Sequence, residues 1–272
     1  MLTKVTGLII REIDNGESDR YLILMTAERG RLFVSAKGVR RMNSSLRSCA
    51  HIMMYGEFTV YEKSGRYTVR EISPIYDFYD ISMGIEKLAF ISYACDVLDD
   101  VCTEEAGQIS LLRLALNTAY AVNESKRDIE FIKAVFEMRL ACEVGFMPDL
   151  GSCECGKTGY IFDIIGGNLY CAECGAAPTE NKRLFMECDS DIIKAMRFIA
   201  SSDISRVFSF ALEGELLSVF YGICEAYLLA QIDRGFKTLE YFKSFLSANR
   251  ALQTGALQTG ALQAHEEKDI GE

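Results

Sequence analysis

The hydrophobic pattern of the chain changes once, near Pro74, and this change limits what the chain can fold into. Before it, five short runs rich in Val, Ile, Leu, Tyr and Phe are separated by turn-forming residues. The runs cover residues 5–13, 21–26, 31–36, 57–61 and 66–70. Ser64-Gly65, between the last two runs, suits a two-residue hairpin turn. This pattern predicts a small barrel or sandwich, and an OB-like five-stranded barrel fits best.

After Pro74 the apolar residues recur at helical spacing. Helices are expected over residues 82–101, 105–122, 128–144, 189–200, 213–233 and 237–246. Ser125-Lys-Arg-Asp128 reads as a capping box at the start of the third helix.

The two patterns together predict an α+β multidomain protein. An N-terminal five-stranded OB-fold β-barrel (residues 1–80) is followed by an all-α domain (81–248) with an inserted zinc knuckle (150–178). Residues 249–272 contain an Ala-Leu-Gln-Thr-Gly repeat with too little apolar area to form a core. We expect this tail to be disordered.

Charge is distributed unevenly between the two halves of the chain. The net charge is −10, yet residues 20–70 hold ten Lys and Arg against three Asp and Glu. This asymmetry indicates a basic binding face on the first domain and an acidic second domain. The alternative is that the basic residues only form a solvated polar surface.

Composition and apolar runs narrow the class of protein. Apolar residues make up 49% of the chain, which excludes a wholly disordered protein. The longest apolar stretch, residues 216–224, is far shorter than the roughly 18 residues that span a bilayer. Arg11 and Glu12 interrupt the N-terminal apolar run before it reaches the length of a signal peptide. We expect a soluble cytoplasmic protein with no membrane partner.

Two pairs of cysteines lie close together in the second half of the chain. Cys153 and Cys155 form a CxC pair, and Cys171 and Cys174 form a CxxC pair 15 residues further on. Four thiolates at such spacing can hold Zn²⁺ tetrahedrally and organise a segment that has little core of its own. We expect a structural zinc site with these four cysteines as ligands. Cys188 is a candidate to replace one of them. The alternative is a set of reduced cysteines without metal.

The segment 151–158 also matches the P-loop pattern GxxxxGK[ST]. A P-loop must follow a buried strand and open a helix, so that the helix N-terminus faces the phosphates. Here a predicted helix precedes the motif and a strand-like run follows it. We therefore expect no nucleotide cofactor and no nucleotide hydrolysis.

The basic stretch holds the candidate nucleic-acid contacts. Lys37 directly follows a predicted strand, and Arg40, Arg41 and Arg47 come next in a loop rich in Ser and Asn. Guanidinium groups beside hydroxyls and backbone amides suit phosphate binding. Arg20 and Arg31, from the same stretch, complete the candidate set. Candidate base-stacking rings are Phe33, Tyr55, Phe58, Tyr61 and Tyr67, about half of which should face the core by strand alternation.

Three segments carry a resemblance to a known family. Residues 29–34 and 36–48 read RGRLFV and AKGVRRMNSSLRS, residues 136–150 read FEMRLACEVGFMPDL, and residues 233–239 read DRGFKTL. In this order they resemble the signatures of the RecO family of bacterial recombination mediators, over roughly residues 1–246. The CxC pair and the repeat tail depart from the family pattern.

The resemblance implies a function as well as a fold. RecO proteins bind single- and double-stranded DNA, anneal complementary strands, and act with RecR and often RecF to load RecA on DNA coated with single-stranded DNA-binding protein (SSB). Some contact the C-terminal tail of SSB. The resemblance implies no catalytic turnover, a cytoplasmic, nucleoid-associated location, and DNA contacts at Lys37, Arg40, Arg41 and Arg47.

Two other classes of function remain open. A zinc-knuckle protein-interaction adaptor would have the same cysteines but no DNA site. An enzyme would need a nucleophile and a base, for which Cys49 and His51, two residues apart on an expected strand, are the candidate pair.

Overall fold

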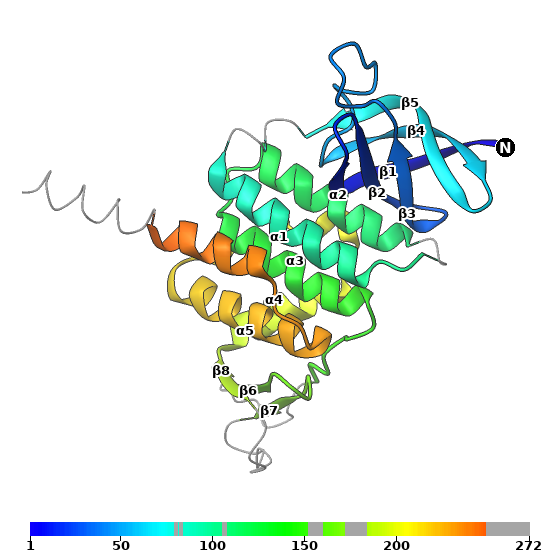
Figure 1. The fold of residues 1–272 in the computed structure, drawn as a ribbon. Helices are drawn as coiled ribbons and strands as arrows, with labels where there is room; N and C mark the ends of the chain where they lie inside the picture. The colour runs from blue at the N-terminus through cyan, green and yellow to red at the C-terminus, as the bar shows by residue number, and fades with distance from the viewer. Residues whose placement is uncertain (79–80, 82–83, 105–107, 152–159, 172–183, 249–272) are drawn as a thin grey trace, which may run out of the picture.

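The N-terminal part of the chain is a closed five-stranded barrel followed by a helical region (Figure 1). The computed structural model describes residues 1–272 except 79–80, 82–83, 105–107, 152–159, 172–183 and 249–272. The barrel strands are β1 (Leu2–Asn15), β2 (Asp19–Thr26), β3 (Gly30–Ala36), β4 (Met54–Lys63) and β5 (Arg66–Asp77). Their order around the barrel is β1-β2-β3-β5-β4, and β1 pairs with β4 to close it. Only β3 and β5 run parallel, as the predicted OB-fold requires.

Alternation of side chains fills the barrel. Phe58 and Val60 point inward from β4, and Leu22 and Leu24 do so from β2. The hairpin between β4 and β5 turns at Ser64 and Gly65, with φ values of 51° and 72°. Two consecutive positive φ values define the tight turn that matches strand twist, and they confirm the predicted hairpin.

The barrel extends further along the chain than the apolar runs predicted. Strand β5 continues to Asp77, past Pro74. Pro74 pairs with Gly56 next to a shift in register between Tyr55 and Gly56. A bulge lets the strand accommodate a proline, which has no N–H to donate to the ladder.

The helical region contains α1 (Ile85–Val101), α2 (Ile109–Glu124), α3 (Ile129–Glu143), α4 (Ser190–Ser201) and α5 (Gly214–Ile232), and a last helical segment covers residues 237–248. Helix α3 lies at the centre, buried over most of its length. The predicted capping box is wrong: the carboxylate of Asp128 itself caps α3 by accepting a hydrogen bond from the Glu130 N–H at 2.9 Å, whereas Ser125 ends α2.

A buried polar network joins α3 to its neighbours. The ammonium of Lys133 lies 2.8 Å from carboxylate oxygens of both Glu137 and Glu225, and Tyr93 donates a hydrogen bond to Glu137 at 2.7 Å. Lys243 binds the other oxygen of Glu225 at 2.7 Å. Since each buried charge has an opposite partner, the network links α1, α3, α5 and the last helix without leaving an unpaired charge.

Helix α5 is, among the described residues, long and apolar enough by length and composition alone to cross a membrane. In the structure Phe220, Ile223 and Leu228 of this helix pack in the core. Its Glu225 is held by the two lysines of the polar network. These contacts make α5 a core helix of the helical region.

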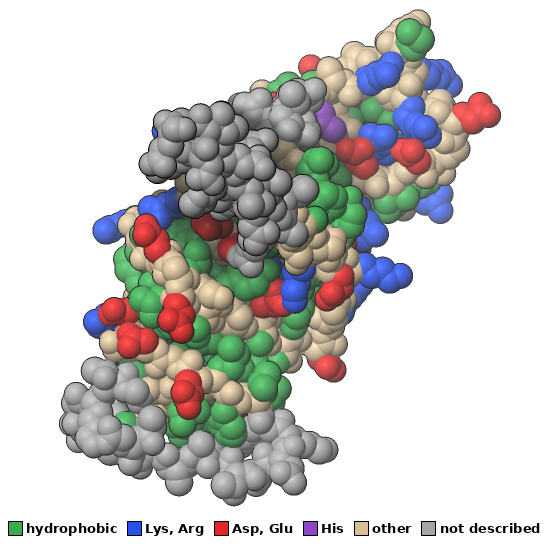
Figure 2. Space-filling view, turned by 90° about the vertical axis from the view of Figure 1, so that its left-hand side faces the viewer, with side chains coloured by type: hydrophobic (Ala, Val, Ile, Leu, Met, Phe, Trp, Pro, Cys, Tyr) green, Lys and Arg blue, Asp and Glu red, His purple; other side chains and the backbone are tan. Residues whose placement is uncertain are grey.

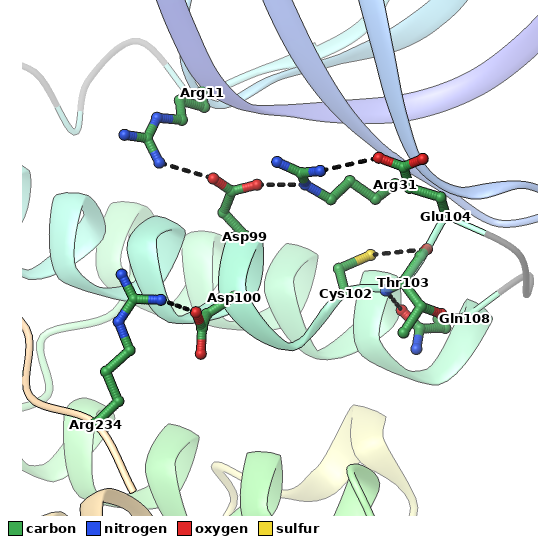
Figure 3. A network of polar contacts seen from close by, with 9 residues as sticks. All are labelled: Arg11, Arg31, Asp99, Asp100, Cys102, Thr103, Glu104, Gln108 and Arg234. Carbon is green, nitrogen blue, oxygen red and sulfur yellow. Dashed lines mark hydrogen bonds and ion pairs between the residues drawn. The ribbon is translucent and has the colours of Figure 1, made fainter. Parts of the chain in front are cut away.

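Besides the core inside the barrel, a second apolar core is shared between the helix-facing side of the barrel and the helices. Ile23 and Met25 of β2 belong to the same buried cluster as the inner faces of α1 and α2. Asp99 of α1 reinforces the contact, since its two oxygens bind Arg11 at 2.8 Å and Arg31 at 2.5 Å (Figure 3). The barrel is therefore fixed against the helices by both packing and charge.

A small three-stranded sheet lies at the far end of the helical region from the barrel (Figure 1). It consists of β6 (Tyr160–Asp163), β7 (Leu169–Cys171) and β8 (Phe185–Cys188), in the order β7-β6-β8. Of the four predicted zinc ligands only Cys171 is described. Cys153, Cys155 and Cys174 lie outside the described residues, as do most of the P-loop-like segment and the predicted disordered tail.

Candidate nucleic-acid interface

The basic loop, which we define as residues 37–53 between β3 and β4, is a series of tight turns. Backbone hydrogen bonds from Arg41 to Gly38, from Ser44 to Arg41 and from Arg47 to Ser44 close successive turns at 3.1–3.2 Å. Three buried side chains of the loop, Val39, Leu46 and Ala50, belong to the barrel core, and Met53 at its end packs in the core shared with the helices. Because these apolar anchors point inward, the polar and basic residues between them are held at the surface.

A carboxylate on β2 fixes the start of the basic loop. The backbone N–H of Gly38 donates to the Asp19 carboxylate at 2.7 Å, and Ser18 donates its hydroxyl at 3.1 Å. The Gly38 bond, then the Ser18 bond, and the nearby charges of Arg41 and Lys37 lower the pKa of Asp19. Gly38 has a φ of +66°, a conformation that favours glycine. The loop therefore leaves β3 in a defined direction.

A groove of about 800 Å³ runs between the basic loop and the β4–β5 hairpin, and we call it the basic groove. The cations that line it are Lys37, Arg41, Lys63, Arg66 and Arg70. No Asp or Glu occurs among the described residues of its lining, and none of the five cations forms an ion pair with a described carboxylate. Ser44, Ser45 and Asn43 add hydrogen-bonding groups. This combination of cations, hydroxyls and amides suits a chain of phosphates.

Of the predicted DNA contacts in the basic loop, the structure places Lys37 and Arg41 in the basic groove. Arg47 is exposed on the same loop, outside the lining of the groove. Arg40 is exposed too, but its guanidinium lies 3.3 Å from the Asp14 carboxylate and donates to the Gly16 carbonyl at 3.1 Å. Its charge is thus partly offset within the protein.

Arg20 and Arg31 are held by contacts within the chain. Arg20 pairs with Glu12 and with Asp14, the latter at 2.9 Å. Arg31 binds Asp99 and, at 3.2 Å, Glu104 (Figure 3). Both side chains stabilise the barrel or its contact with α1, and their role as DNA contacts stays a prediction.

The sequence analysis did not select Lys63, Arg66 and Arg70 as site residues. Lys63 and Arg66 flank the hairpin turn at Ser64 and Gly65, and Arg70 lies four residues further along β5. The antiparallel pair Lys63–Arg66 and the parallel pairing of β5 with β3 bring them beside the basic loop. The sequence Arg66-Tyr-Thr-Val-Arg70 could have indicated this, because residues two apart on a strand share a face. Arg66 and Arg70 are therefore expected on the same side of β5.

The candidate stacking rings divide by face. Phe33 and Tyr61 are exposed on the outside of the barrel. Phe58 lies in the barrel core, Tyr55 packs against the core shared with the helices, and Tyr67 packs partly against the barrel core. The alternation argument is therefore confirmed, and two rings remain accessible.

The proposed Cys49–His51 pair does not lie on a strand, because both residues are in turns of the basic loop. His51 has one ring nitrogen 3.4 Å from the Asp77 carboxylate and the other 3.1 Å from the Ile52 carbonyl oxygen. The sulfur of Cys49 contacts the Ser48 hydroxyl at 3.5 Å. Neither contact brings the thiol and the imidazole together as a nucleophile and base.

The small sheet carries two cysteines, Cys171 and Cys188, on the strands that flank β6. Tyr160 pairs with Cys171 on one side and with Cys188 on the other, so the two cysteines flank β6 at one level. Strand β6 begins and strand β7 ends at this level. Burial raises the pKa of the Cys188 thiol to about 12.

Charge on the surface follows the division between barrel and helices. Figure 2 shows Lys and Arg side chains concentrated at the barrel end, with some carboxylates among them, and Asp and Glu spread over the helical part. On this face, a polyanion would therefore meet its most attractive surface at the barrel.

Comparison with known proteins agrees with this geometry. Residues 1–78 match the family model described as "Recombination protein O N terminal", and residues 84–240 match "Recombination protein O C terminal". The chain is 29% identical to the "DNA repair protein RecO" of Acetivibrio thermocellus over 89% of its length and 96% of that protein. It is 25% identical to the protein of the same name from Caldicellulosiruptor saccharolyticus, over 88% and 97%. It is 26% identical to that of Listeria monocytogenes, over 76% and 80%.

Proposed function

The chain belongs to the recombination protein O (RecO) family of DNA repair proteins, and we propose that it is a recombination mediator that binds single- and double-stranded DNA and anneals complementary strands. The observation that supports this most is the basic groove, whose five cations face no carboxylate among the described lining residues. Recombinational repair is the general role that fits the family.

Annealing needs the repulsion between two polyanions to be offset while the bases stay accessible. Lysine and arginine side chains that neutralise phosphates release condensed counterions, and this release drives binding without sequence preference. In the basic groove, Lys37 and Arg41 come from one wall and Arg66 and Arg70 from the other. A backbone held between these walls has its phosphate charge offset along its length. No bond is made or broken in this process, so we propose no catalytic turnover.

The helical region is the surface that we propose for protein partners. Residues 81–272 contain more acidic than basic residues, which is unfavourable for DNA. We propose that RecR, and in some settings RecF, contacts this part of the chain. We also propose that the helical region binds the C-terminal tail of SSB when RecA is loaded on SSB-coated DNA. The protein would act in the cytoplasm, at the nucleoid.

Binding of DNA at low salt separates this proposal from the adaptor alternative. We would measure binding of the full chain to a labelled single strand and to a duplex, without nucleotide. The matched variant is Lys37→Gln with Arg41→Gln, which removes two groove cations. The control is Lys4→Gln with Lys194→Gln, because both lysines are already paired with carboxylates, at 2.6 and 2.7 Å. If the chain is a mediator, only the groove variant should lose affinity for DNA. If it is an adaptor, neither the unaltered chain nor either variant should bind the single strand or the duplex.

We also propose that the cysteine knuckle holds a structural Zn²⁺. The donor set supports this, since four thiols in a CxC and CxxC arrangement match the ligands of closed structural sites. Cys171 at the end of β7 would be one ligand, and Cys153, Cys155 and Cys174 the others. Metal analysis of the purified chain should give about one zinc per chain, and Cys171→Ser should lower that content. A chain that folds fully without zinc would contradict the proposal.

A further inference from the structure

One row of side chains crosses the outer face of the barrel from β2 to β4. Tyr21 pairs with Ser35, Ser35 with Thr68, and Thr68 with Tyr61. Paired residues on neighbouring strands point to the same face, so the four side chains lie side by side. Two aromatic rings therefore stand at the ends of the row, with two small hydroxyl side chains between them.

Phe33 enlarges the aromatic end of this row at β2 and β3. Its ring centre lies 4.7 Å from that of Tyr21, with 31° between the ring planes. Phe33 is 45% exposed although it is large and apolar, and its strand neighbours Leu32 and Val34 are buried. Tyr21 thus supports a ring whose other surface is open to solvent.

The opposite end of the row combines a ring with a cation. Tyr61 is 37% exposed, and the guanidinium of Arg70 lies over its ring, 5.5 Å from the ring centre. Both an aromatic ring and a guanidinium plane can stack on a nucleobase.

This row joins the basic groove to a second groove. The second groove has a volume of about 910 Å³ and includes Tyr21, Phe33 and Ser35. Lys37, Arg66 and Thr68 line both grooves, so the two are continuous.

The charges of the two grooves differ. The second groove contains Glu28 and Glu104 beside its cations, whereas no described residue lining the basic groove is acidic. Phosphates are therefore favoured along the cations of the basic groove. The exposed rings at the two ends of the row offer surface for uncharged bases: Phe33 in the second groove and Tyr61 at the edge of the basic groove.

We propose that this row is a base-stacking subsite for single-stranded DNA, in which unpaired bases stack on Phe33 and Tyr61 while the phosphates follow the basic groove. The inference rests on the proposed function, because it assigns the selectivity of the same DNA site. A duplex keeps its base faces stacked within the helix, so only an unpaired strand can use the rings. Bases that stack by their faces keep their pairing edges free for a complementary strand.

The test compares three probes of equal length: a thymidine oligonucleotide, an abasic oligomer with the same number of phosphates, and a duplex. The variants are Phe33→Ala, Tyr61→Ala and Phe33→Leu, which keeps the apolar volume but removes the ring. The control is Tyr120→Ala, an aromatic residue on α2 that is 57% exposed. Because all these side chains are exposed, circular dichroism of each variant should match that of the unaltered chain.

We expect the unaltered chain to bind the thymidine strand at least about fivefold more tightly than the abasic strand, the lower limit for one stacked base. Phe33→Ala, Phe33→Leu and Tyr61→Ala should lose about fivefold or more for the thymidine strand and nothing for the abasic strand or the duplex. Equal binding of thymidine and abasic strands by the unaltered chain would overturn the inference and leave the phosphate site intact. Binding to none of the probes would overturn the proposed function itself.

Discussion

Removal of Arg41 and Arg66 should change how the DNA affinity responds to salt. The five groove cations set an upper limit of five neutralised phosphates. For a single strand, each neutralised phosphate contributes about −0.7 to the slope of log K against log salt concentration, which gives a slope of about −3.5 for five. The affinity should then fall by about 130-fold between 50 and 200 mM salt. In Arg41→Gln with Arg66→Gln the slope should be about −2.1, and the same fall should be about 18-fold.

Fluorescence anisotropy of a labelled single strand over this range of salt measures both slopes. The control is again Lys4→Gln with Lys194→Gln, which changes the net charge by the same amount. Its slope should equal that of the unaltered chain, because neither lysine lines the groove. An equal change of slope in both double variants would show that only the net charge of the chain matters and that the groove is not the phosphate site. An unchanged slope in the groove variant would place the phosphate site elsewhere.

Three further predictions concern the stability of the fold. Glu137→Leu leaves the buried ammonium of Lys133 with one carboxylate fewer, so it should reduce the free energy of unfolding by about 3 kcal/mol in urea titrations. A loss below about 1 kcal/mol would mean that the pair is not buried as described. Asp99→Ala removes the carboxylate that binds two barrel arginines, so it should reduce the free energy of unfolding by about 2 kcal/mol. If this free energy does not fall, packing alone holds the barrel to α1. The pKa of Asp19 is lowered in the folded chain, so its contribution to stability is full above the ordinary aspartate value of about 3.9 and is lost as the pH falls through the lowered pKa. Unfolding midpoints measured from pH 5 downward should therefore depend less on pH in Asp19→Asn, and an unaltered acid profile would contradict the contact with Gly38.

The elements that sequence analysis predicted well are those whose signal is local. Period-two alternation and a Ser-Gly turn were enough to place β4, β5 and their hairpin. Helical spacing was enough to place α3, although its cap proved to be Asp128. Both Ser125 and Asp128 can cap a helix, and only the path of the chain out of α2 decides between them.

The site was predicted less completely because it depends on pairing between distant residues. Lys37 and Arg41 could be selected from one stretch of sequence, but Lys63, Arg66 and Arg70 join them only through the register of β3, β4 and β5. Arg31 is of a residue type that commonly contacts DNA, but in the structure it binds Asp99. This partner lies 68 residues away in the sequence, so local sequence could not reveal it.

Strand annealing is the most direct experiment on whether this chain is a recombination mediator. Two complementary labelled single strands would be mixed with the purified full chain, without nucleotide, at low and at high salt. We expect the chain to accelerate duplex formation and the acceleration to fade as salt rises. Lys37→Gln with Arg41→Gln should weaken the acceleration, whereas Lys4→Gln with Lys194→Gln should not. If the unaltered chain gives no acceleration and binds neither strand at low salt, the basic groove is not a DNA site, and the proposal that this chain is a recombination mediator is wrong.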